Sequence, residues 1–115
     1  MNNPTIKFME NWNNKLNCSY FTTIRLYTKE KFNYYTDNLG NKFNVLLQGK
    51  KYCKAILIGR YEWTLKEVFA YHFNYLDAGL DIGNFIKLMR GFYRKKKEWK
   101  EWDTKVILLI FKKIK

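Results

Sequence analysis

The segment Phe21-Thr22-Thr23-Ile24-Arg25-Leu26 predicts a β-strand that carries polar side chains on one of its faces. Successive side chains of a strand point to opposite faces, so we expect Ile24 and Leu26 to point towards a core. Thr23 and Arg25 then point the other way, with aromatic side chains flanking them. An arginine beside a threonine hydroxyl suits recognition of an anion or a nucleobase. The alternative is a half-buried antiparallel strand with one solvent-exposed face.

The composition is that of a basic protein with enough apolar residues to fold. The chain has 115 residues, of which 47% are hydrophobic and 19% aromatic, which suits a single domain with one modest core. Its formal net charge of +12 raises the local concentration of polyanions and speeds their encounter with the protein. We therefore expect nucleic acid as the partner. The alternative is that the excess of lysine only provides solubility.

The cysteines and the apolar segments of the sequence indicate in which cellular compartment the protein is located. Cys18 and Cys53 lie far apart and lack metal-ligand spacing, so we expect reduced thiols in an intracellular protein, with a disulfide between them as the alternative. Residues 1–15 lack the apolar run of a signal peptide. The longest apolar run, residues 106–111, is too short to span a bilayer. The sequence predicts a cytoplasmic protein without a membrane partner.

The predicted elements follow the order helix, strand, hairpin of strands, two helices, strand. Strands clustered around a hairpin, with the helices grouped elsewhere, favour an α+β fold over a doubly wound sheet. We expect a small, partly open β-barrel with helices packed on one side, in a single domain over residues 1–115. The elements are a helix from Asn3, a strand at 21–27, a polar connection at 29–42, hairpin strands at 43–48 and 51–62, helices from Thr64 and Asp81, and a strand at 105–112.

The clearest helix begins at Thr64, because Thr64 and Glu67 have the spacing of a capping box. An apolar stripe continues along residues 65–76, and Gly79 is placed to end the helix in a left-handed conformation. His72 is the only histidine and lies within this stripe. We therefore predict a partly buried core histidine, and no metal site made of several histidines.

Four local features resemble the ASCH domain of the PUA-like superfamily. They are Phe-Thr-Thr-Ile-Arg at 21–25, the hairpin around 48–50 with the strand after it, Asp-Ala-Gly-Leu at 77–80, and the closing strand at 106–111. The resemblance covers the chain from about Trp12 to its end. It implies a small β-barrel with a cleft near the Thr/Arg strand, and RNA binding or an RNA-linked function. Some ASCH proteins are ribonucleases, and others are hydrolases that cleave modified nucleosides.

The resemblance also implies roles for single residues. The small amidohydrolases of the family have a Lys-x-x-Thr arrangement, in which the threonine corresponds to Thr23 and the following arginine to Arg25. Their later acidic residue corresponds to Asp77, and their lysine is replaced by Tyr20. A tyrosine hydroxyl, with a pKa near ~10, is a poorer base than such a lysine. If the protein is an enzyme, the catalytic candidates are Thr23, Asp77 and Tyr20, since Lys15 lies too far upstream without a different local path.

The resemblance further implies a ligand-binding cleft lined by Thr23, Arg25 and Asp77. Arg25 is suited to a bidentate contact with a phosphate or a base edge, or alternatively to a structural ion pair with Asp77 or Glu67. Asp77 would bind a base amino group, or else serve as a carboxylate at a helix end. The sequence contains no phosphate-binding loop and no dinucleotide fingerprint, so we expect no cofactor.

A basic segment at 94–102 contains the side chains that we predict to bind nucleic acid. Lysines can follow a phosphate backbone while aromatic rings stack on exposed bases. The alternative is that the tryptophans of this segment are buried on one helical turn. The predicted nucleic-acid-binding residues are Arg94, Lys95, Lys96, Lys97 and Lys100.

The sequence therefore predicts an RNA- or nucleotide-binding module, with a small hydrolase of a modified nucleoside or of RNA as the alternative. RNA is preferred over duplex DNA because no DNA-reading recognition helix is evident. An acidic protein is the alternative partner.

Overall fold

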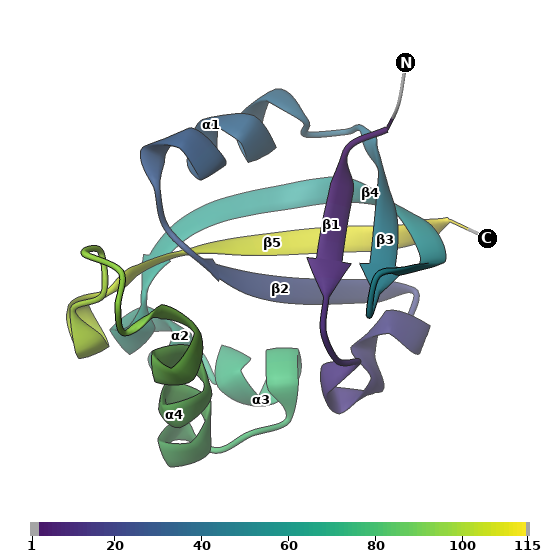
Figure 1. The fold of residues 1–115 in the computed structure, drawn as a ribbon. Helices are drawn as coiled ribbons and strands as arrows, with labels where there is room; N and C mark the ends of the chain where they lie inside the picture. Colours follow the sequence, from purple (N-terminus) through teal and green to yellow (C-terminus); the bar gives the residue numbers. More distant parts are fainter. Residues whose placement is uncertain (1–2, 115) are drawn as a thin grey trace.

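The chain forms a curled β-sheet with helices on both of its sides, as the computed structural model shows (Figure 1). The structure describes residues 3–114, without the side chains of residues 12, 13, 75 and 76. The elements are β1 (Thr5–Phe8), η1 (Trp12–Asn17), β2 (Tyr20–Leu26), α1 (Lys29–Asp37), β3 (Lys42–Leu47), β4 (Lys50–Thr64), α2 (Leu65–Ala70), α3 (Phe73–Ala78), α4 (Ile82–Tyr93), η2 (Glu101–Asp103) and β5 (Lys105–Ile114), where η1 and η2 are short 3₁₀ helices.

The five strands lie in the order β1-β3-β4-β5-β2, so β1 and β2 are the two edges. β1 runs parallel to β3, and every other pairing is antiparallel. The pairing of β4 with β5 shifts its register between Leu57 and Gly59, at a β-bulge. A Cβ at Gly59 would lie only 3.3 Å from the Ile110 side chain, so this residue lets the bulged strand approach β5 closely. The sheet curls into a half-barrel.

Aromatic and aliphatic side chains fill the inside of the half-barrel. Phe21 of β2 stacks on Phe111 of β5 with ring centroids 5.2 Å apart, and Phe43 of β3 meets the same ring edge-on. Tyr35 of α1 is buried against Phe43, so α1 covers the inner side of the sheet. Burial raises the pKa of the Tyr35 hydroxyl, although the nearby charge of Arg25 opposes this shift.

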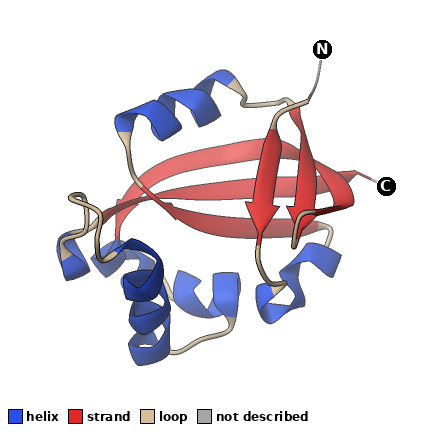
Figure 2. Cartoon of the chain, viewed as in Figure 1, coloured by secondary structure: helices blue, strands red, loops and turns tan. Residues whose placement is uncertain are grey.

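Helices α2, α3 and α4 cover part of the outer side of the sheet (Figure 2). Their apolar side chains, including Leu65, Val68 and Phe85, pack with Ile24 of β2 and Leu108 of β5 in a second core. Both sides of β2 are therefore covered, and the alternative of a strand with one solvent-exposed face is wrong. The predicted α+β class and barrel-like sheet are confirmed, with the difference that α1 lies on the inner side.

The predicted helix at Asn3 is wrong, because this segment forms the edge strand β1. Ile6 and Phe8 are buried while the residues between them are exposed, which is the two-residue period of a strand. Met9, which a helical stripe would have buried, is 72% exposed. The backbone groups of β1 pair with β3, a contact distant in sequence that local patterns do not reveal.

The predicted polar connection at 29–42 contains the helix α1. Thr28 caps it by accepting a hydrogen bond from the backbone N–H of Lys31, and Gly40 then turns the chain with φ of +83°. The hairpin that follows is as predicted, with Gly49 at φ +79° between β3 and β4. The closing strand β5 is confirmed as well.

The predicted helix from Thr64 is present but interrupted. The capping box of Thr64 and Glu67 is confirmed, and so are the positive φ of Gly79 and the Asp81 cap of α4. At His72 the backbone takes φ of +62°, which divides the stripe into α2 and α3 and leaves this histidine exposed. The expectation of a core histidine is therefore wrong. Residues 75 and 76 of the predicted stripe lie outside the described side chains.

Among residues 3–114, no helix combines the length and the apolar character needed to cross a membrane.

Replacing Thr64 by alanine should lower the free energy of unfolding by about 1 kcal/mol, because the cap bond to the backbone of Glu67 is lost. Urea denaturation followed by circular dichroism measures this change. The control is Thr36→Ala, since the Thr36 hydroxyl bonds only to the Phe32 carbonyl within α1 and should change stability by less than about 0.5 kcal/mol. Equal losses in the two variants would contradict the capping role.

Candidate functional site

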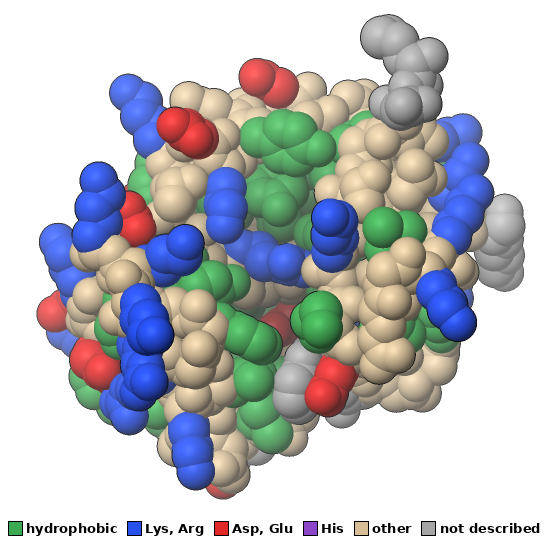
Figure 3. Space-filling model, viewed as in Figure 1, with side chains coloured by type: hydrophobic (Ala, Val, Ile, Leu, Met, Phe, Trp, Pro, Cys, Tyr) green, Lys and Arg blue, Asp and Glu red, His purple; other side chains and the backbone are tan. Residues whose placement is uncertain are grey.

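A cavity of about 320 Å³ opens between the edge strands β1 and β2 and the helices α3 and α4. The three residues predicted to line a cleft, Thr23, Arg25 and Asp77, all line this cavity. Phe85 and Met89 of α4 provide an apolar wall opposite the polar groups. Figure 3 shows the half-barrel side of the molecule hollowed near its centre, with Lys and Arg side chains gathered around the hollow. The site therefore combines cationic groups with an apolar surface.

A buried ion pair lies at one end of the cavity. The Lys15 ammonium donates to Asp77 Oδ1 at 2.8 Å, and only 6% and 9% of the two side chains are exposed. The Thr22 hydroxyl donates to the same oxygen at 3.0 Å. Lys15 reaches this position because η1 turns the chain back after β1, which is the local path that the sequence did not reveal. Asp77 therefore pairs with Lys15, and the predicted alternative of an ion pair with Arg25 is wrong.

Burial lowers the pKa of the Lys15 amine, and the charge of Arg25 adds to this effect. The charge and hydrogen bond of Asp77 act in the opposite direction but do not outweigh burial. A lysine with a lowered pKa spends more of its time as a neutral amine at a given pH. Lys15 is thereby suited to exchange a proton with a group bound in the cavity.

Arg25 joins the two edges of the sheet. Its Nε donates to the Thr23 hydroxyl at 2.9 Å and its Nη2 donates to the Lys7 carbonyl of β1 at 2.8 Å. The guanidinium also lies over the Phe8 ring, 4.9 Å from its centroid. These two bonds use only two of the several N–H donors of the guanidinium group. Arg25 can therefore bind a ligand anion while it holds the edge strands β1 and β2 together.

Arg60 is a cation of the inner side that the sequence did not reveal. Its Cα pairs with Leu109 across β4 and β5, and its guanidinium lies 4.2 Å from the centroid of the Phe32 ring of α1. Its Nε is buried and has no hydrogen-bond partner among the described residues. Alternation from the buried Ala55 and Leu57 would have placed Arg60 on the outer side. The bulge shifts that alternation, and no local signal in the sequence marks it.

Tyr20, which the predicted resemblance to the ASCH domain matched with a lysine, is not among the residues that line the cavity. It is 55% exposed, and its ring lies 6.0 Å from the ammonium of Lys112. The lysine of the site is Lys15 instead.

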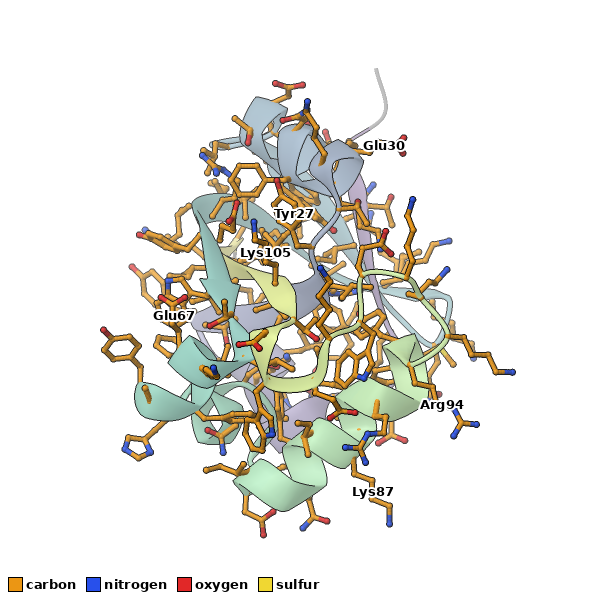
Figure 4. All side chains as sticks on the ribbon, turned by 90° about the vertical axis from the view of Figure 1, so that its left-hand side faces the viewer. Tyr27, Glu30, Glu67, Lys87, Arg94 and Lys105 are labelled. Atoms are coloured by element: carbon orange, nitrogen blue, oxygen red, sulfur yellow. The ribbon has the colours of Figure 1, made fainter. Side chains whose placement is uncertain are left out.

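The predicted nucleic-acid-binding side chains are exposed and follow directly after α4. Figure 4 shows Arg94 pointing away from the molecule at the end of that helix. The nearby tryptophans have structural roles, because Trp99 packs on the outer core and donates to Glu101 at 3.2 Å. Trp102 meets Phe69 edge-on with ring centroids 5.1 Å apart. Trp99 is thus half-buried, whereas Trp102 remains 44% exposed. The exposed basic side chains of the segment are Arg94, Lys95, Lys96, Lys97 and Lys100.

Neither the acidic residues nor the cysteines gather into a metal site. Within the part of the chain that the structure describes, no three His, Cys, Asp or Glu side chains are placed to hold a metal ion. Cys18 is exposed and Cys53 is half-buried, and both are free thiols. Burial raises the pKa of the Cys53 thiol, so this group is less reactive than an exposed cysteine.

Comparison with known proteins found no matching family model, no matching curated protein and no matching solved structure. The resemblance to the ASCH domain therefore stays a prediction.

Replacing Lys15 by methionine should lower the free energy of unfolding by about 3 kcal/mol, because it leaves the Asp77 carboxylate buried without its partner. The double variant Lys15→Met/Asp77→Asn removes both charges and keeps an oxygen for the Thr22 hydroxyl, so it should recover more than half of that loss. Urea denaturation of the wild type, both single variants and the double variant completes the cycle. Additive losses would show that the two groups do not interact.

Proposed function

We propose that the protein is an RNA- or nucleotide-binding module of the PUA-like kind, and that its cavity receives one nucleotide. The observation that carries this proposal is Arg25, a cation whose contacts are a carbonyl, a hydroxyl and an aromatic ring. It lines a cavity of about 320 Å³, near the lower end of the volumes that ligand sites of proteins have. Arg25 and Lys7 would hold a phosphate, and the apolar wall of α4 would contact the base.

The basic segment supports the same proposal, because it begins where the cavity ends. Phe92 and Tyr93 line the cavity, and Arg94 follows them directly in the chain. An RNA whose terminal nucleotide lay in the cavity would pass this segment, and Arg94 to Lys97 would neutralise its phosphates. Sequence-independent contacts would then supply salt-dependent affinity, and the cavity would supply selectivity.

The mononucleotide site can be tested with labelled nucleoside 5′-monophosphates. Arg25→Ala should weaken their binding by about 10-fold or more, because a charge-assisted contact to the phosphate is lost. The charge-matched control is Lys31→Ala on α1, which should change affinity by less than about 2-fold. Fluorescence anisotropy measures binding, and circular dichroism checks that each variant folds. Unchanged binding in a folded Arg25→Ala variant would refute the proposal.

The basic segment can be tested through the salt dependence of binding to single-stranded RNA. Lys95→Gln/Lys96→Gln/Lys97→Gln should lower affinity and reduce the slope of log K against log salt by about 2, since each phosphate contact contributes about 0.7. Lys29→Gln/Lys31→Gln/Lys66→Gln is the control with the same change of charge. A reduction that is equal in the two triple variants would assign the effect to net charge alone.

Hydrolysis of a modified nucleoside is a second candidate function, and the buried Lys15 favours it. A neutral Lys15 amine would take a proton from a water molecule or a threonine hydroxyl as that oxygen attacks an amide carbon, and would give the proton to the amide nitrogen as the C–N bond breaks. If threonine is the nucleophile, a water molecule would then hydrolyse the resulting ester and release the carboxylate. Thr23 lies in the same cavity, and Asp77 holds the amine in place. Lys15 would thus supply the base that Tyr20, with its exposed ring, does not.

This second function predicts a particular pH dependence. The reaction needs the neutral amine, so the rate should rise with pH through the pKa of Lys15, which lies below the ordinary value for lysine. Release of a carboxylate from an acylated nucleoside measures turnover in the wild type and in Lys15→Arg, which keeps the charge but is not a base at neutral pH. Equal turnover in the two proteins would exclude Lys15 as the base.

A further inference from the structure

The outer side of the sheet is covered over only part of its area. Helices α2, α3 and α4 pack on the part that contains Ile24, Val106 and Leu108. The opposite end carries a row of side chains across four strands, because Tyr20 pairs with Lys112, Lys112 with Ile56, and Ile56 with Lys42. The next row pairs Asn44 with Lys54 and Lys54 with Ile114. We call this surface the open sheet end, and its residues are Tyr20, Lys42, Asn44, Lys54, Ile56, Lys112 and Ile114.

Nearly all of the net charge of the protein lies outside residues 62–103, in the part of the chain that contains the strands of the sheet together with η1 and α1. Residues 62–103, which include α2, α3, α4 and the basic segment, carry eight basic and seven acidic side chains, a net charge of +1. The rest of the chain carries 14 basic and three acidic side chains, a net charge of +11. The segments 41–61 and 104–115, from which β3, β5 and most of β4 come, contain no acidic residue. The open sheet end is therefore a source of positive potential.

The lysines of this surface are not neutralised by carboxylates. The ion pairs of the described residues involve Lys15, Lys66, Arg90 and Lys105, and none of these belongs to the open sheet end. The cations of the basic segment form no ion pair among the described residues either, since Glu101 pairs with Arg90 and Asp103 with Lys66. The segment differs in its net charge, because Glu98, Glu101 and Asp103 lie close to it in sequence. A polyanion would therefore meet a stronger field at the open sheet end than at the end of α4.

Aromatic and aliphatic side chains lie among these lysines. Tyr20 is exposed beside the Lys112 ammonium, and Ile56 lies between Lys112 and Lys42 in the row. Exposed rings of this kind stack on unpaired bases, and neighbouring lysines hold the phosphates between the bases.

We infer that the open sheet end binds single-stranded nucleic acid, with Lys42, Lys54 and Lys112 on phosphates and Tyr20 stacked on a base. A duplex presents phosphates but hides the faces of its bases, so it would use the lysines and leave Tyr20 and Ile56 without a partner. The inference goes beyond the proposed function, since it uses neither the cavity nor the basic segment. Binding here requires no contact with Arg25.

The test uses a labelled single-stranded RNA of about 12 nucleotides, within the range that one small domain covers. Lys54→Gln/Lys112→Gln should weaken its binding by about 10-fold and reduce the salt slope by about 1.4, since two phosphate contacts are lost. The control Lys29→Gln/Lys31→Gln on α1 removes the same charge and should weaken binding by less than about 2-fold. Equal weakening in the two double variants would overturn the inference.

Substitutions at Tyr20 separate stacking from charge. Tyr20→Ala should weaken binding by about 5-fold or more without changing the salt slope, and Tyr20→Phe should retain the wild-type affinity. Because Tyr20 is exposed, both variants should fold, and circular dichroism checks this. Unchanged affinity in Tyr20→Ala, or competition by duplex RNA as effective as by the single strand, would overturn the inference.

Failure of this inference can be told from failure of the proposed function. Arg25→Ala tests the cavity through mononucleotides, and the variants at Lys54 and Lys112 should bind mononucleotides as the wild type does. Loss of mononucleotide binding in Lys54→Gln/Lys112→Gln would mean that the two surfaces are not separate, and would overturn the assignment of the open sheet end as an independent site.

Discussion

The buried pair of Lys15 and Asp77 is the interaction on which the site depends. It joins η1, at the start of the chain, to α3, which lies more than half of the chain away, and through Thr22 it reaches β2 as well. A buried ion pair adds little net stability compared with apolar side chains of similar size. The pair instead determines position, because it joins η1, β2 and α3 at one end of the cavity that β1 and α4 also line. Loss of either charge would leave the other without a partner in an environment that disfavours it.

The two edges of the sheet impose the second constraint. A half-barrel leaves β1 and β2 without strand partners on one side, and unpaired edges invite pairing with other chains. Arg25 bridges these edges by bonding to the Lys7 carbonyl, and the Phe8 ring lies beneath its guanidinium. The residue proposed to bind a phosphate therefore also holds the edges in place. For this reason, every binding measurement on an Arg25 variant needs a check that the variant folds. A ligand bound to Arg25 should in turn strengthen the connection between β1 and β2.

Local signals predicted much of the fold, and contacts distant in sequence account for what they missed. The hairpin at Gly49, the capping box at Thr64 and the closing strand each depend on residues within a few positions of one another. β1 was missed because its partner β3 lies about 40 residues later, and Pro4 suits a helix start as well as a strand entry. In the site, Thr23, Arg25 and Asp77 were predicted together and do line one cavity. The positions of Lys15 and Arg60 were not predicted. The 3₁₀ helix η1 turns Lys15 towards the cavity, and the β-bulge in β4 turns Arg60 to the inner side of the sheet.

The distribution of charge relates the two proposed binding surfaces to each other. A net charge of +12 by itself indicates only that the protein attracts polyanions. In the sequence, the basic residues are most densely clustered in the exposed segment after α4. The structure changes this interpretation, because acidic side chains gather around the helices and nearly balance that segment, whereas the sheet carries the excess. If both proposals hold, long-range attraction would bring a polyanion first to the sheet, and short-range contacts in the cavity would distinguish one nucleotide from another. Under these two proposals, attraction of the polyanion and recognition of the nucleotide would occur at different surfaces, since charge attraction by the lysines of the sheet needs no defined geometry, whereas Arg25 is held by two hydrogen bonds.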